Sequence, residues 1–286
     1  MKTAGQQYQT FKFGGLTAGL FLALLGTSAL DAFGKDTLWI KATIYDHYAM
    51  TADDSGYFEF NPDADGSSSP GICEQTVSNM VKDTLEEDSP PSLDQYVPCA
   101  YNNDLERWFT EDAGNIDPAK RVIEVSEFFP MEYQSEGVYN YNNPSFFPLD
   151  GKSNTLVDQG IEAGIEGPDS KLHNFGFTVH LRTEFTYRQK AANNSRIAFT
   201  GGDDFWVYID NILIMDFGGI HNKSGGPVHL KQLIDDGVLE LEEGENYTLD
   251  FFYAKRHTHH TGFNLSIHLD LLKPAKKFAF QVFKIR

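Results

Sequence analysis

The sequence of 286 residues contains only two cysteines, and its 23 lysines and arginines are far outnumbered by 41 aspartates and glutamates. The shortage of basic residues gives a formal net charge of −18. It argues against nucleic-acid and anionic-membrane partners, because both bind through Lys and Arg side chains that face phosphate. Such a surface attracts cations instead, although acidity that serves only solubility explains the charge equally well.

The motifs of common enzymes are also missing. The sequence has no phosphate-binding loop, no HExxH zinc motif and no nucleophile elbow. We therefore expect a protein that is not an enzyme. A secreted hydrolase is the weakest alternative, since the paired carboxylates of a glycosidase meet only in the folded chain.

One apolar stretch lies near the N-terminus, and no second stretch of membrane-spanning length follows it. Lys2 and Lys12 precede the run Leu16–Leu30, which is shorter than the roughly 20 residues that a spanning helix needs. Small residues at 27–29 then offer a cleavage point. The pattern predicts a signal peptide at 1–29, with an uncleaved signal-anchor as the alternative. After cleavage we expect a secreted protein, extracellular or at the cell surface, with no insertion into the membrane.

The two cysteines agree with export. Cys73 and Cys99 are expected to form a disulfide in an oxidising compartment, and closing a loop of this length stabilises by about 3 kcal/mol in the chain-entropy model. Two free buried thiols are the alternative. Sequons for N-glycosylation occur at Asn193, Asn222, Asn246 and Asn264, of which we expect the first three to carry glycans.

Alternation of apolar and polar residues dominates the second half of the chain. Along 175–187 every second residue is apolar or Thr, whereas His180 and Arg182 fall on the polar face, which predicts a long half-buried strand. A two-residue turn, Asp210-Asn211, joins two further strands. Strands are predicted at 38–45, 175–187, 196–200, 205–209, 212–217, 238–241, 247–254 and 263–271.

The first half of the chain holds one helical pattern. Apolar residues recur at helical spacing along 77–87, and two prolines follow at 90 and 91, which predicts a short amphipathic helix that ends there. The whole pattern predicts a mainly β fold, an antiparallel β-sandwich with one or two short helices. No linker divides the mature chain, so we expect a single domain over 35–286.

The most informative motif is Gly201-Gly202-Asp203-Asp204, which leads directly into the strand FWVYI. Two adjacent carboxylates repel each other unless positive charge lies between them. A calcium ion suits such a site, because it takes six to eight oxygen ligands in variable geometry. The alternative is a solvated acidic turn, since Asp and Gly are common in turns.

A second polar segment, RHTHHTGFN, joins the last two predicted strands. His257, His259 and His260 suggest part of a zinc site, but no cysteine or His-Glu motif accompanies them. An exposed polar loop is the plainer interpretation. A third is that its backbone carbonyls and Asn264 complete an oxygen site with the aspartate pair. His221 lies in a third cluster, DFGGIH, where it is a ligand or base or simply forms a local hydrogen bond.

Taken in order, these segments resemble the fibro-slime domain family, secreted domains of bacterial fibre-associated and slime-mould extracellular proteins. The resemblance covers nearly the whole mature chain. It rests on the series LWIKATIYDH, TVSNMVKDTLEEDSPP, RWF, FFPLDG, HNFGFTVHLRTEFTY, FTG, the stretch from Asp203 through WVYIDNILIMDFGGIH to Tyr247, DFFYA and RH. It implies the jelly-roll sandwich of the anthrax protective-antigen domain and the yeast flocculin adhesins.

In the related adhesins an adjacent Asp pair coordinates calcium, and the ion orders sugar hydroxyls. The resemblance therefore implies that Asp203 and Asp204 are metal ligands, with Asn264 as a further donor that would be poorly placed for glycosylation. Two departures weaken the calcium expectation: the family commonly has Asp where Gly202 stands and Glu where Lys255 stands. Ligand contacts are expected at His221, His257, His259, His260 and Gly262.

The resulting expectation is a secreted calcium-dependent carbohydrate-binding or adhesion module. Its partner would be an extracellular glycan or a cell-surface or matrix glycoprotein. The alternative is an extracellular signalling or matrix-assembly protein that uses the same fold with a purely structural calcium.

Overall fold

The computed structural model describes residues 37–48, 60, 73, 75–100, 102, 105–111, 122–221, 224–256, 258 and 261–273. By its internal contacts the chain divides into two units, Met1–Thr37 and Leu38–Arg286. Of the first unit the structure describes Thr37 alone, so the predicted signal peptide at 1–29 lies outside the described residues.

Strands are the main secondary structure of the described residues in the second unit. They are β1 (Thr37–His47), β2 (Val122–Tyr133), β3 (Val138–Asn143), β4 (Ile165–Glu166), β5 (Leu172–His173), β6 (Phe177–Thr186), β7 (Arg196–Gly201), β8 (Asp204–Ile209), β9 (Ile212–Phe217), β10 (Ser224–His229), β11 (Asn246–Lys255), β12 (Phe263–His268) and β13 (Asp270–Leu271). Within the described residues, eleven strands join in one sheet in the order β10-β7-β12-β3-β2-β1-β6-β11-β8-β9, with β13 beside β6. The strands β4 and β5 pair separately.

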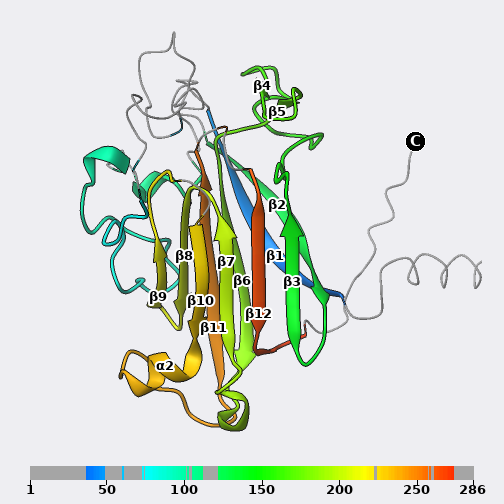
Figure 1. Cartoon of the computed structure of the whole chain (residues 1–286). Coiled ribbons are helices and arrows are strands. Elements are labelled where there is room, and N and C mark those ends of the chain that lie inside the picture. Colours follow the sequence, from blue (N-terminus) through cyan, green and yellow to red (C-terminus); the bar gives the residue numbers. More distant parts are fainter. Residues whose placement is uncertain are drawn as a thin grey trace, which may run out of the picture. The chain divides into compact units, whose positions relative to one another are not determined.

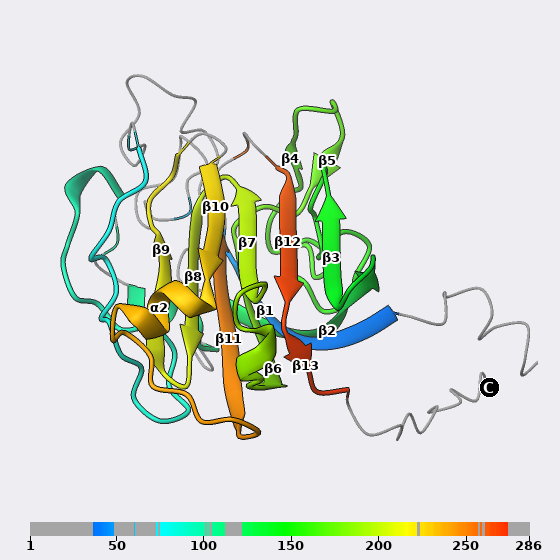
Figure 2. The same cartoon turned by 60° about the horizontal axis from the view of Figure 1, so that its bottom comes forward.

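The large sheet folds over to form two layers. Strands β10, β7, β12 and β3 lie in front of β8, β11, β6 and β1 in both views (Figures 1 and 2). The pairings that define the layers, such as β11 with β6 and β12 with β7, are antiparallel. A mainly β, antiparallel sandwich is therefore confirmed.

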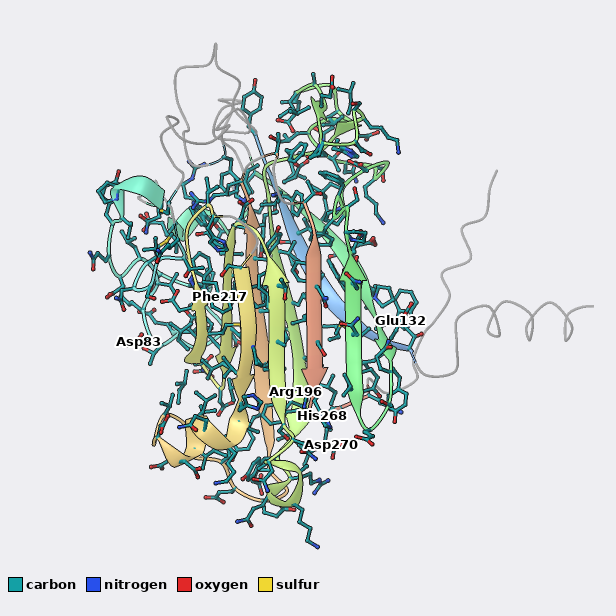
Figure 3. All side chains as sticks on the ribbon, in the orientation of Figure 1. Asp83, Glu132, Arg196, Phe217, His268 and Asp270 are labelled. Carbon is teal, nitrogen blue, oxygen red and sulfur yellow. The ribbon has the colours of Figure 1, made fainter. Side chains whose placement is uncertain are left out.

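The main core fills the space between these two layers. Side chains from both layers contribute to it, among them Phe199 and Leu265 from one layer and Val179 and Phe251 from the other. Polar residues gather where the strands end: Arg196 of β7 and His268 of β12 are register partners at one end of the sheet (Figure 3).

A second, smaller core lies on the opposite face of β8 and β11. Every residue of β8 is buried, because Phe205, Val207 and Ile209 face the main core while Trp206 and Tyr208 face the smaller one. The segment that precedes β2 covers this face and supplies the smaller core with Met80, Val81, Leu105, Trp108 and Phe109. The strand β8 is thus sandwiched between the two cores.

The segment 77–87 is not helical, so that prediction is wrong. It runs as an irregular chain along the edge strand β9, with bridges from Val77 to Gly218 and from Thr84 to Ile212. Its apolar residues at helical spacing reach the smaller core from this irregular backbone, with Met80 and Val81 fully buried. Tertiary packing thus replaces the helical hydrogen bonds that the pattern suggested.

The helix of the described chain is α2 (Leu230–Asp235), which follows β10. Short 3-10 helices within the described residues are η2 (Pro98–Ala100), η3 (Leu105–Arg107) and η5 (Gln189–Ala191). In the described residues no helix has the length and apolar character needed to cross a membrane. The predicted strand at 238–241 is wrong, because this segment is irregular and follows α2.

Candidate functional site

The two aspartates that the sequence analysis singled out lie at the turn between β7 and β8. Asp203 adopts a φ of 66°, and Asp204 is the first residue of β8. Both side chains have no exposed surface. A solvated acidic turn is therefore wrong for this motif.

Two cations lie directly beside the aspartates. The register of β11 with β8 pairs Ala254 with Asp204, which places the end of β11 next to the turn. The Lys255 Nζ atom lies 2.9 Å from Asp203 Oδ2, and the Arg256 backbone N–H donates to the same oxygen at 3.0 Å. The Arg256 guanidinium donates to Asp204 through Nε at 2.7 Å and through a terminal nitrogen at 3.2 Å.

We call Asp203, Asp204, Lys255 and Arg256 the buried ion-pair cluster, since none of the four has exposed surface. Its formal charges cancel. Burial raises the pKa of Asp204, and the Arg256 guanidinium opposes this rise. The positive charge that the carboxylate pair requires is thus supplied by the end of β11.

The cluster also joins two other segments of the chain. The backbone N–H of Gly219, after β9, donates to Asp204 Oδ1. Arg256 donates to the carbonyl of Ala100, and its guanidinium carbon lies 4.5 Å from the centroid of the Trp108 ring. The cluster therefore ties β8 and β11 to the segment that precedes β2.

These contacts do not fit a calcium ion between the two aspartates. Calcium needs six to eight oxygen ligands at 2.3–2.6 Å. Here N–H groups of Lys255, Arg256 and Gly219 occupy carboxylate oxygens of the pair instead. Across the described part of the chain, His, Cys, Asp and Glu side chains form no group of three or more that could hold a metal ion. The calcium assignment stays a prediction that only a titration tests.

The remaining predicted ligands are spread over different places. Asn264 is half-buried in β12, between the core residues Phe263 and Leu265, so its side chain faces away from the main core. His221 is 2% exposed and lies two residues after Gly219. Gly262 is partly exposed just before β12. The predicted ligands His257, His259 and His260 lie outside the described residues.

The predicted modification sites are described only in part. Cys73 is buried and disulfide-bonded, but the side chain of Cys99 lies outside the described residues, so their pairing stays a prediction. Asn193 and Asn246 are exposed, as an N-glycan requires, while Asn222 lies outside the described residues. Glycosylation itself stays a prediction.

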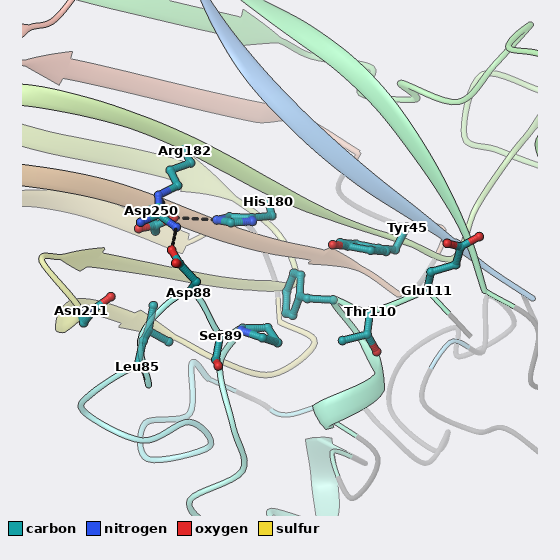
Figure 4. Close-up of a pocket in the computed structure, with 12 residues that line it drawn as sticks. Tyr45, Leu85, Asp88, Ser89, Thr110, Glu111, His180, Arg182, Asn211 and Asp250 are labelled. Atoms are coloured by element: carbon teal, nitrogen blue, oxygen red, sulfur yellow. Dashed lines mark hydrogen bonds and ion pairs between the residues drawn. The ribbon is translucent and has the colours of Figure 1, made fainter. Parts of the chain in front are cut away.

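A pocket that the sequence analysis did not predict lies on the outer face of β1, β6 and β11 (Figure 4). It has a volume of about 300 Å³. The segment that precedes β2 and the β8–β9 turn form its other walls. Its lining residues are Tyr45, Leu85, Asp88, Ser89, Pro90, Phe109, Thr110, Glu111, His180, Arg182, Asn211 and Asp250. We call it the outer-face pocket.

A chain of polar contacts runs along one wall of the outer-face pocket. The carboxylate of Asp250, 3% exposed, lies 2.6 Å from His180 Nε2. Arg182, on the same side of β6, lies 3.7 Å from Asp250 and donates to Asp88 at 2.9 Å (Figure 4). The ring of His180 is also stacked on Phe252, at 4.3 Å between centroids. These contacts form a row of hydrogen-bonding groups in which Asp250 is buried while Arg182 and Asp88 are exposed.

Aromatic side chains lie beside this polar row, since Tyr45 of β1 and His180 of β6 come from neighbouring strands. Tyr45 and Phe109 meet edge to face, with ring centroids 6.5 Å apart. Burial raises the pKa of Tyr45 to about 12, and the nearby carboxylates of Glu124 and Glu111 add to the rise. The Tyr45 phenol therefore keeps its proton at neutral pH and can donate a hydrogen bond.

The sequence pattern predicted the orientation of some of the residues that line this pocket. The alternation along β6 correctly assigned His180 and Arg182 to the polar face of the strand. The contribution of Asp250 was not recognised, because its strand is buried on both faces and reads as a continuous apolar run around it. Tyr45, Asp88 and Glu111 are brought together only by the fold.

The second unit is thus a β-sandwich that carries the outer-face pocket on one of its faces. Among known proteins the chain is similar to protein psiR of Dictyostelium discoideum, 30% identical over 80% of this chain and 21% of psiR. It is also similar to protein psiC of the same organism, 30% identical over 88% of this chain and 44% of psiC. The chain therefore spans less than half the length of these relatives. No family model matches it.

Solved structures show a weaker likeness. A PA14 sugar-binding domain from an RTX adhesin covers 80% of this chain and 87% of its own length, with 9% identity and a TM-score of 0.31. At this TM-score the likeness carries no argument about the function of the chain.

Proposed function

We propose that the chain is a secreted carbohydrate-binding or adhesion module of the fibro-slime type, and that it binds a glycan in the outer-face pocket. The observation that carries this proposal is the composition of the pocket. Aromatic side chains line one part of it, and a row of hydrogen-bonding groups lines another. Sugars offer both apolar C–H faces and hydroxyl groups, so they match such a mixed surface.

Each part of the pocket has a role in this proposal. Tyr45 is only partly buried and gives the apolar face of a sugar ring a surface to pack against, whereas Phe109 is 3% exposed and supports the Tyr45 ring from the core side. Asp250 accepts hydrogen bonds from hydroxyl groups, and Arg182 donates to them. His180 holds the buried Asp250 carboxylate, so little of its side-chain freedom is lost on binding.

The size of the pocket sets the expected affinity. A volume of about 300 Å³ is at the lower end of the range for ligand pockets, which suits one or two sugar rings. A single site of this kind binds weakly. Adhesion would then need several copies on one surface, where linkage raises the effective concentration.

A glycan array followed by calorimetry tests the proposal. The full secreted chain is applied to the array, and the best glycan is titrated into wild type and into variants Asp250→Asn and Tyr45→Phe. We expect at least a tenfold loss of affinity for Asp250→Asn and a smaller loss for Tyr45→Phe, which removes only the hydroxyl group. Asp235→Asn, on the exposed face of α2, serves as the control and should bind like wild type. If both pocket variants are folded and still bind the glycan like wild type, the glycan does not bind in the outer-face pocket and this part of the proposal is wrong.

The alternative function is extracellular signalling or matrix assembly through protein contacts. One observation favours it: Phe128 and Tyr133 of β2 are 49% and 40% exposed. A chain that binds no glycan on the array, but whose binding to cells is lost in Phe128→Ser, would support this alternative.

A further inference from the structure

We infer that Lys255 and Arg256 replace a bound divalent cation in this chain, and that they position one wall of the outer-face pocket without calcium. The stability part of this inference stands on its own, whereas the ligand-binding part rests on the proposed function.

The two carboxylates of the buried ion-pair cluster are neutralised by two cations of the chain itself. Two fully buried carboxylates repel each other strongly in a medium of low dielectric constant, so a folded chain must bring positive charge to them. Lys255 and Arg256 bring two unit charges, at 2.9 Å from Asp203 and 2.7 Å from Asp204. This matches the charge of one divalent cation at the same carboxylates.

Carboxylate oxygens of Asp203 and Asp204 accept hydrogen bonds from nitrogen donors of the same cluster and its neighbours. Asp203 Oδ2 accepts hydrogen bonds from both Lys255 Nζ and the Arg256 backbone. Both oxygens of Asp204 accept hydrogen bonds from Arg256, and one accepts a further bond from Gly219. A metal ion would have to displace these donors and would then leave two buried cations without their carboxylates, which is strongly unfavourable.

Contacts of Arg256 connect the buried ion-pair cluster to the outer-face pocket. Arg256 donates to the carbonyl of Ala100 and lies over the ring of Trp108. The carbonyl of Trp108 in turn accepts a hydrogen bond from Thr178 of β6. Phe109, the next residue, lines the outer-face pocket, and so do Thr110 and Glu111. The cluster therefore fixes the start of the segment that forms this wall.

The test begins with the wild-type chain and calcium alone. After treatment with EDTA, the midpoint of thermal unfolding is measured with and without 5 mM calcium, and calcium is titrated in by calorimetry. We expect a shift of less than about 1 °C and no saturable heat. A shift of several degrees together with a saturable site that Asp203→Asn abolishes would overturn the inference.

Two lysine variants test the replacement itself. Lys255→Met removes the buried charge and should lower the unfolding midpoint by several degrees, with or without calcium. Lys255→Glu places a third carboxylate in the cluster and should make the midpoint rise on addition of calcium. Lys231→Met is the control, because Lys231 forms an exposed ion pair with Asp235 on α2. Equal midpoints for Lys255→Met and Lys231→Met would contradict a structural role of the cluster.

Hydrogen exchange tests the positioning of the wall. In the wild type, exchange of the amides at 105–111 should be the same in EDTA and in calcium. In Arg256→Met these amides should exchange faster while those of β7 and β12, on the other layer, keep their protection, because Arg256 is the residue that contacts Ala100 and Trp108. Uniformly faster exchange would show a general loss of stability and would refute the positioning role. None of these measurements depends on glycan binding. A failure of this inference can therefore be told apart from a failure of the proposed glycan-binding function.

Discussion

The guanidinium carbon of Arg256 lies 4.5 Å from the centroid of the Trp108 ring while its Nε donates to Asp204 at 2.7 Å. A planar guanidinium can make both contacts at once, because its N–H groups point outward in its plane while its face covers the ring. A lysine ammonium has no planar face and a single nitrogen, so it cannot keep the contacts to Asp204, Ala100 and Trp108 together. The identity of this residue as arginine is therefore part of how the chain anchors the Trp108 segment to the sheet.

The variant Arg256→Lys should accordingly destabilise the fold although it keeps the charge. We expect a decrease of about 2–3 kcal/mol in the free energy of unfolding, somewhat below the loss seen when a buried ion pair is broken outright. Urea denaturation measures it. The matched control is Arg188→Lys, whose exposed pair with Asp270 at 3.1 Å should contribute less than about 1 kcal/mol. Similar losses in the two variants would contradict this role of Arg256.

Asp46 predicts a pH dependence of stability. Burial raises the pKa of Asp46 to about 7, even though the backbone N–H of Leu156 and the side chain of Asn174 lower it in part. Because the folded-state pKa lies above the unfolded value, the folded state favours the protonated form. Its contribution to stability is complete below pH 4 and is lost as the pH rises towards 7, by an amount on the order of 4 kcal/mol.

The variant Asp46→Asn should remove most of this dependence, because an amide cannot ionise but can still accept from Leu156. We expect its free energy of unfolding to change less between pH 5 and pH 8 than that of the wild type. Urea denaturation at both pH values measures the difference. Asp235→Asn, at an exposed position on α2, should behave like the wild type. A wild-type stability that does not fall over this interval would contradict the assignment.

His173 predicts a second pH dependence, in the segment around β5. Its ring lies between Asp150, at 2.6 Å, and Asp169, at 2.7 Å, and is stacked on Phe147. Burial lowers the pKa of His173, but the hydrogen bonds to the two carboxylates outweigh it and the net pKa is raised. The stabilisation is therefore present below about pH 6.5 and is lost as the pH rises through the folded-state pKa.

Hydrogen exchange at pH 6 and pH 8.5, corrected for intrinsic rates, measures this effect at the amides of 164–174. We expect protection to decrease at the higher pH in the wild type and to be low at both pH values in His173→Gln. His229→Gln, at an exposed position before α2, serves as the control. Protection that is independent of pH in the wild type would show that the two carboxylates do not stabilise the charged ring.

The sequence predicted those parts of the fold that depend on local chemistry. The turn Asp210-Asn211 adopts φ values of 48° and 70°, as a two-residue hairpin between twisted strands requires, so β8 and β9 were predicted correctly. The alternation in β6 predicted its buried and polar faces. In contrast, the segment 77–87 has a helical pattern but meets β9 instead, and only the tertiary fold reveals that partner.

The candidate site could be predicted only in part for the same reason, because its residues meet only through the tertiary fold. From the sequence we expected positive charge at Asp203 and Asp204 and assigned it to calcium, whereas Lys255 lies beside Asp203 and Arg256 beside Asp204. The residues that bring it, Lys255 and Arg256, are about fifty positions away, and only the register of β11 with β8 places them there. The outer-face pocket needs six separate segments of the chain, so no local pattern could have located it.

Two adjacent glycines of β10 allow a direct test of the sheet itself. Gly225 has a φ of 150° and pairs with Thr200 of β7; a Cβ atom there would lie 1.9 Å from the carbonyl oxygen of Phe199. At Gly226 a Cβ atom would meet nothing within 4 Å. The two positions carry the same residue on the same strand, but they differ completely in the space available.

We therefore expect Gly225→Ala to lower the free energy of unfolding by at least about 2 kcal/mol, since the backbone of β7 cannot move away without breaking the pairing. Gly226→Ala should be neutral or stabilising by up to about 1 kcal/mol, because alanine reduces the freedom of the unfolded chain. Urea denaturation of both variants measures the difference. If both substitutions had the same effect, β10 would not lie as close to β7 as the register requires.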